Sequence, residues 1–233
     1  MALIEKLTAI AEGIRGKTGK EDKLTLEQMA EEITYLPIGS TAEDGVIEKT
    51  VVSYTNNRIA KVGYASFQNC KNLEFVDLPN VTTIDASGFY GCSLLKEANI
   101  PKLVSAAGGN VFVGCSSLQE AKFPEYDANC PAFNNCSSLR LVDLYIVGQI
   151  GSNAFSGCTS LETIIFRDIK KSIPTLMGTG AFNNTPIGKG TGYIYVPKAL
   201  VEQYKDATNW INFADQFRAI EDYPEICGGV AND

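Results

Sequence analysis

A block of about 22 residues recurs through the middle of the 233-residue chain and limits the architectures open to it. Each block reads Phe-x-[Gly/Asn]-Cys-x-x-Leu-x-x-[Val/Ala/Ile]-x-apolar, often closed by proline, and the sixth is degenerate. Steps of 22, 23, 21, 22 and 27 residues separate the leading phenylalanines, which are Phe67, Phe89, Phe112, Phe133, Phe155 and Phe182. One block cannot bury a core alone, but stacked blocks share one. The pattern predicts a mainly β solenoid of about five to six coils.

The position before the cysteine accepts only glycine or asparagine. All six blocks obey this rule, with Asn69, Gly91, Gly114, Asn135, Gly157 and Asn184. These two residues tolerate a left-handed backbone best, so we expect a sharp corner there. The alternating apolar residues that follow suit a short strand. A second apolar pair, such as Val81 and Ile84, precedes the next phenylalanine. Each coil should therefore have two apolar edges and one corner.

Five of the seven cysteines occupy one column of successive coils. They are Cys70, Cys92, Cys115, Cys136 and Cys158, and Thr185 takes that place in the last coil. We interpret the column as a structural ladder of small buried thiols, with disulfide pairing as the alternative. Metal ligation is disfavoured because the chain has no histidine to join the column. Cys130 and Cys227 have no evident partner. Unpaired cysteines indicate synthesis in a reducing cytoplasm.

Strand residues that point away from the core should form parallel columns on one face of a solenoid. These candidate ligand-binding residues are Phe75, Asp77, Glu97, Asn99, Glu120, Lys122, Leu141, Asp143, Tyr145, Thr163, Ile165 and Arg167. The aromatic and apolar members, Phe75, Leu141, Tyr145 and Ile165, are the informative ones at solvent-facing positions. Two interpretations stay open: a solvated face, or a platform for a carbohydrate or protein.

The amino-terminal residues 1–36 carry two apolar stripes at helical spacing and predict a helix-turn-helix hairpin. The stripes are Leu3, Leu7, Ile10 and Ile14, then Leu26, Met29 and Ile33. So small a core must pack on the repeats, on another copy or on a different protein. We therefore interpret the hairpin as an assembly or anchoring module. Residues 37–45 read as a linker, 46–220 as the solenoid with a two-strand start around Asn56-Asn57, and 221–233 as a tail.

The stretch "AEGIRGKT" (11–18) ends like a phosphate-binding loop, but its context is wrong. Such a loop follows a buried strand and opens a helix, whereas here a helical stripe precedes it. Gly16 falls where a helix C-cap glycine belongs. We predict no nucleotide and no other cofactor.

The amino-acid composition argues against several classes of function and partner. The net charge of −7 argues against nucleic acid as a partner. No apolar run reaches the length of a membrane span, and Glu5 and Lys6 interrupt any secretory signal. Without histidine the commonest general base is missing, and no catalytic group of residues assembles. We predict a protein that is not an enzyme, with no metal and no membrane partner.

The repeated lines, such as "FVGCSSLQEAKFP", resemble the BspA-type branch of the leucine-rich repeats, found in bacterial surface proteins and some phage proteins. The resemblance covers about residues 59–197. Residues 193–220 are similar to that family's terminal unit, which implies an amphipathic helix after Pro197 and a C-terminal helical cap, with Trp210 and Phe213 over the open end of the stack. "PKLVSAAGGNVF" and "DIKKSIPTLMGTGAF" depart from the pattern, so coils three and six should be irregular.

Residues 7–33 resemble a short module of bacteriophage tail-associated virion proteins. The resemblance implies a non-enzymatic structural or adhesion protein of the virion, made in the host cytoplasm. Its hairpin would bind other virion proteins or copies of itself, and its repeat face a bacterial surface protein or glycan. The alternatives are a bacterial cell-surface adhesin of the repeat family, or a decoration protein without receptor binding.

Overall fold

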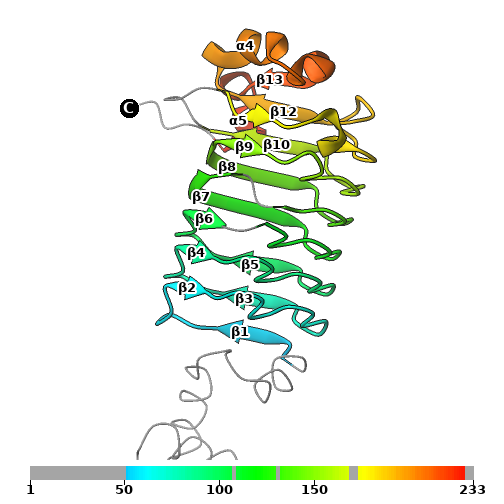
Figure 1. Ribbon diagram of the computed structural model, residues 1–233. Helices are drawn as coiled ribbons and strands as arrows, with labels where there is room; N and C mark the ends of the chain where they lie inside the picture. The colour runs from blue at the N-terminus through cyan, green and yellow to red at the C-terminus, as the bar shows by residue number, and fades with distance from the viewer. Residues whose placement is uncertain (1–50, 107–108, 130–131, 168–172, 229–233) are drawn as a thin grey trace, which may run out of the picture. The chain divides into compact units, whose positions relative to one another are not determined.

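The structure is a computed structural model that describes residues 51–106, 109–129, 132–167 and 173–228. The predicted hairpin and linker lie outside these residues, as does Cys130. The described residues form a stack of coils whose strands pair only in parallel (Figure 1). Each coil places residues of the same type at equivalent positions, so equivalent side chains of neighbouring coils contact one another.

The first edge of the coils carries two parallel sheets. The three-stranded sheet comprises β1 (Ser53–Thr55), β3 (Phe75–Asp77) and β5 (Glu97–Asn99). The five-stranded sheet comprises β7 (Glu120–Ala128), β8 (Leu141–Val147), β10 (Thr163–Phe166), β12 (Tyr193–Val196) and β13 (Phe217–Ala219). The second edge is made of shorter strands: β2 (Lys61–Val62), β4 (Thr83–Ile84) and β6 (Ser105–Ala106), then β9 (Gln149–Ile150) and β11 (Thr175–Leu176).

The two strands expected around Asn56 form a complete first coil. β1 pairs with β3 and β2 with β4, each in the register of the later coils. Asn56 is buried and holds the bend between them. Its Nδ2 donates to the Tyr54 hydroxyl at 2.8 Å, and its Oδ1 accepts from the backbone N–H groups of Arg58 and Ile59. A buried asparagine thus satisfies the backbone donors that the bend leaves unpaired.

A column of phenylalanine rings runs through the core. The rings of the six repeat phenylalanines stack in succession, with neighbouring centroids 4.9–5.7 Å apart and ring planes within 12°. Tyr54 meets the first ring edge-on at 5.2 Å, and Phe213 meets the last at 5.0 Å. Parallel coils impose this stacking because each one places its phenylalanine directly over the previous one.

The predicted left-handed corner is confirmed at all six positions. Their φ angles are 60° to 80° at Asn69, Gly91, Gly114, Asn135, Gly157 and Asn184. A second left-handed corner lies two residues before the phenylalanine in three coils. Ala65, Ser87 and Asn110 adopt φ angles of 54° to 59° there. Sequence reasoning missed it, because alanine and serine give no signal for this conformation.

The irregular coil differs from the one predicted. Residues 101–112 do supply an apolar pair, since Leu103 and Ala106 are both buried. The break comes in the next coil, where β7 continues to Ala128. Within the described residues, no second-edge strand lies between β6 and β9. The Tyr126 hydroxyl fills part of that gap: it accepts from the Ala106 N–H at 3.3 Å and donates to the Asn129 carbonyl. The extra residues of the sixth coil, 168–172, lie outside the described ones.

The segment after Pro197 is a mixture of short turns instead of one amphipathic helix. α4 spans Val201–Asp206 and is preceded by a 3-10 turn, Lys198–Leu200. Asn209, with φ 64°, separates α4 from a kinked 3-10 segment, Trp210–Gln216, which leads into β13. Trp210 is buried, and its Nε1 donates to the Pro174 carbonyl at 2.8 Å. Trp210 and Phe213 both contact Phe182, the last ring of the column.

The predicted tail begins too early. The 3-10 turns Thr179–Phe182 and Ile220–Asp222 and the helix α5 (Pro224–Cys227) complete the list of elements. Cys227 is buried against Ile165, Tyr195 and Ile220, so residues as far as Cys227 belong to the folded stack. None of the helices in the described ranges is long and apolar enough to span a membrane.

Candidate functional site

The outward residues of the first-edge strands lie in two rows. The first row is Phe75 and Glu97 on one sheet, then Glu120, Leu141, Thr163 and Tyr193 on the other. The second row is Asp77 and Asn99, then Lys122, Asp143, Ile165, Tyr195 and Arg218. The strand register therefore brings the predicted columns together as expected. Tyr193, Tyr195 and Arg218 extend them beyond the predicted residues.

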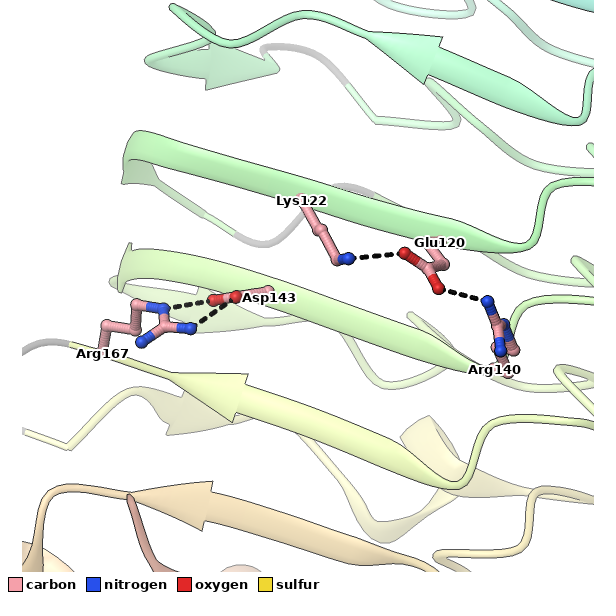
Figure 2. A network of polar contacts seen from close by, with 5 residues as sticks. All are labelled: Glu120, Lys122, Arg140, Asp143 and Arg167. Carbon is pink, nitrogen blue, oxygen red and sulfur yellow. Dashed lines mark hydrogen bonds and ion pairs between the residues drawn. The ribbon is translucent and has the colours of Figure 1, made fainter. Parts of the chain in front are cut away.

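Most charges of these rows are paired with one another. Glu120 contacts Lys122 at 2.6 Å and also contacts Arg140 of the next coil (Figure 2). The hydrogen bond from Lys122 is the main cause of a lowered Glu120 pKa. Asn99 donates to Asp77 at 2.7 Å. These contacts are exposed and individually weak. They nevertheless give the charged side chains involved partners within the protein.

Asp143 and Arg167 form the least exposed ion pair in this region. The Arg167 Nε and Nη2 donate to the two Asp143 carboxylate oxygens, both at 2.7 Å (Figure 2). Nη2 also donates to the Cys227 carbonyl at 2.5 Å. The hydrogen bond that Arg167 donates to Asp143 is the main cause of a raised Arg167 pKa. The pair is therefore a clasp that ties α5 to the strand face, and we call it the Asp143–Arg167 clasp.

Ile165 is not on an open surface, which corrects its place among the solvent-facing candidates. Its side chain is 1% exposed and packs with Tyr195, Ile220 and Cys227, with Tyr223 beside them. The second row is apolar at β10 and β12, and α5 covers it there. Burial raises the pKa of the Tyr195 hydroxyl, and that of the Cys227 thiol to about 11.

The other predicted apolar candidates are half-buried: Phe75, Leu141 and Tyr145. The more exposed aromatic residue of the first row is Tyr193, at 38%. The Arg218 guanidinium lies over its ring, 4.3 Å from the centroid. Sequence reasoning missed this pair because it sits in the terminal unit, which departs from the repeat. The alternation of "GYIYVP" was the available signal.

The five cysteines of the predicted ladder lie buried in one column of the stack. No disulfide joins Cys70, Cys92, Cys115, Cys136 and Cys158, against the alternative of bridges among them. Four of these thiols donate to the carbonyl of the preceding coil's phenylalanine at 2.9–3.1 Å; they are Cys92, Cys115, Cys136 and Cys158. The Thr185 hydroxyl instead donates to Phe182 of its own coil at 2.7 Å. Burial raises the Cys115 pKa to about 12 and holds the thiol neutral.

No three side chains of metal-ligating type gather at one place in the residues that the structure describes. The model of the BspA type leucine rich repeat region matches residues 47–144 and 129–191, with six copies of the repeat. No curated protein matches the chain. The matched residues make up more than half of the sequence and include the phenylalanine column, the corner and the thiol ladder. The chain therefore belongs to the BspA type leucine-rich repeat family.

Proposed function

We propose that the protein is a non-enzymatic binding protein whose repeat domain holds a ligand on its first row. Repeats of this family generally serve as binding modules. The observation that carries the proposal is the contrast between the rows. The second row is largely occupied by polar contacts and by α5, whereas the first row, apart from the paired Glu120, presents half-buried and exposed side chains at strand spacing. A rigid stack holds them in a fixed array, which lowers the entropic cost of binding.

The ligand in this proposal is a bacterial surface protein or glycan, and the protein is a tail-associated component of a bacteriophage virion. The support for the virion role is the resemblance of residues 7–33. The predicted hairpin, residues 1–36, would join the protein to other virion proteins or to copies of itself.

Binding of the labelled full chain to bacterial cells tests the first-row role. Glu97→Lys and Thr163→Lys place a long charged side chain on the row, and each should weaken binding about tenfold or more. Gln203→Lys, on exposed α4, is the matched control and should bind like the wild type. Equal binding by all three variants would exclude the first row as the contact.

Purified particles test the virion role separately. The protein should be found in them by mass spectrometry, and its detection only in the host cytoplasm would exclude this role. Recovery from the bacterial wall would favour the alternative of a cell-surface adhesin. Presence in particles without any binding to cells would favour a decoration protein.

A further inference from the structure

The last strand of the stack carries an arginine whose charge no described carboxylate neutralises. Arg218 ends the second row on β13, and its neighbour in register is the buried Tyr195. Several other cations of the coils contact an acidic side chain: Lys61 with Asp85, Lys96 with Glu74, Lys122 and Arg140 with Glu120, and Arg167 with Asp143. Among the described residues, no carboxylate lies within ion-pair distance of Arg218. In the described residues β13 is the end strand of its sheet, so no further described strand supplies one.

The Arg218 guanidinium is nevertheless held in place. Its Nη1 donates to the carbonyls of Asp215 and Phe217, at 2.8 and 2.7 Å, and its plane lies over Tyr193. The edge formed by Nε and Nη2 has no hydrogen-bond partner in the described part of the chain. Arg167 uses that same edge to bind Asp143 with two hydrogen bonds. Arg218 therefore presents a fixed, open fork of the kind that binds a carboxylate.

The surroundings of this fork are hydroxylic and aromatic. Tyr193 is partly exposed, and Thr163 lies beside it in register on β10. The hydroxyl groups of both residues make no hydrogen bond within the described ranges, and a hydroxyl both donates and accepts. An exposed aromatic ring packs against apolar C–H groups. A sugar ring with hydroxyls and a carboxylate matches all three features, whereas an acidic peptide side chain matches only the arginine.

We infer that Arg218, Tyr193 and Thr163 form a binding site for an acidic saccharide, a sugar that carries a carboxylate. Arg218 binds the carboxylate through Nε and Nη2, and the two hydroxyls bind sugar hydroxyls. The inference rests on the proposed binding role, because it names the ligand class and the part of the strand face that binds it: Thr163 and Tyr193 of the first row and Arg218 of the second.

Calorimetric titration of the full chain tests the site with two acidic probes, a galacturonate oligomer and a sialylated oligosaccharide. The neutral control ligand is the methyl ester of the galacturonate oligomer. We expect the acidic form of at least one probe to bind, and Arg218→Lys to weaken it about tenfold or more, since lysine lacks the fork. Tyr193→Ala should weaken it too. Arg140→Lys, at a paired exposed arginine, should bind like the wild type.

Unchanged unfolding midpoints for the variants, measured by circular dichroism, show that they are folded. Lysine keeps most of the apolar stem of arginine, so a loss of binding in the folded variant can then be attributed to the missing Nε and Nη2 donors. Equal binding of the methyl ester would overturn the inference, as would a glutamate-rich peptide bound as tightly through Arg218. Failure of the wild type to bind either acidic probe overturns this site alone if the full chain still binds cells. Failure to bind cells as well rejects the proposed function.

Discussion

Single residues at the left-handed corner determine how closely the coils approach. A Cβ atom added to Gly157 would lie only 2.5 Å from the Oδ1 atom of Asn135 in the preceding coil. Asn69 stands in the same relation to Gly91, at 2.4 Å. Gly114 follows another glycine, and its nearest neighbour would be the Gly91 Cα at 3.6 Å. Asparagine in one coil thus requires glycine in the next.

Alanine substitutions at Gly114 and Gly157 should separate the cost of backbone strain from the cost of steric overlap with a side chain of the preceding coil. Both positions have a positive φ, so each alanine costs about 1–2 kcal/mol in backbone strain. At Gly157 the new methyl group also meets Asn135, which adds about 1–3 kcal/mol. Urea unfolding followed by circular dichroism measures both. The pair Asn135→Gly with Gly157→Ala should recover the added cost, and a double variant whose losses simply add would contradict this explanation.

At the scale of elements, α5 is a short helix held on the strand face by few contacts. Four residues long, it packs through Cys227, and the Asp143–Arg167 clasp fixes its last carbonyl. The arginine links two strands of the sheet to a segment 60 residues further along the chain. Local opening of such an element requires little else to unfold.

Loss of the clasp should expose Cys227. Arg167→Lys removes the two-pronged contact to Asp143, so labelling of Cys227 by a thiol reagent should accelerate about tenfold. Mass spectrometry resolves this site from the cysteines of the ladder, whose labelling should stay slow. Lys198→Ala is the control because it removes an exposed pair with Asp222 on the same segment. Exposed ion pairs contribute little to stability, so the labelling rate of Cys227 in the Lys198→Ala variant should change less than about twofold. Equal acceleration in both variants would contradict a clasp.

At the scale of the whole molecule, the thiol ladder makes stability depend on alkaline pH. Burial raises the Cys115 pKa from 9.0 to about 12, and the thiols of Cys92 and Cys136 shift in the same direction. A thiol with a higher pKa in the folded state binds its proton more tightly there than in the unfolded chain. Its contribution to stability is therefore complete below pH 9 and is lost as pH rises toward the folded pKa.

Unfolding in urea, measured with a reductant between about pH 8 and pH 10, should show this loss. One pH unit above the unfolded pKa, each such thiol costs about 1.4 kcal/mol. Cys115→Ser places a hydroxyl that does not ionise in this range, so its pH dependence should be shallower by that amount. Parallel pH profiles for the two proteins would show that this thiol is not the titrating group.

The sequence predicted the parts of this fold that recur, and missed those that occur once. The corner and the thiol ladder followed from six aligned blocks, because one physical requirement acts on the same position each time. Ile165 was placed on the correct side of its strand, but its neighbours show nothing of the helix that covers it. Tyr126 replaces a strand pairing through one hydroxyl, and no periodic pattern signals that. The pair of Tyr193 and Arg218 depends on the end of the stack, where the repeat itself stops.

The interruption near Tyr126 has a mechanical consequence. Neither edge has a continuous strand ladder at this level: β5 and β7 belong to different sheets, and so do β6 and β9. The phenylalanine rings remain stacked across it, from Phe89 through Phe112 to Phe133. Backbone hydrogen bonds of the corner also cross this level, such as the one from the Gly91 N–H to the Val113 carbonyl at 2.8 Å. Under tension along the stack, this level would bear the load through packed rings and these corner bonds, while the neighbouring levels have strand ladders as well. We therefore expect bending or extension of the solenoid to concentrate at this level, between two stiffer halves.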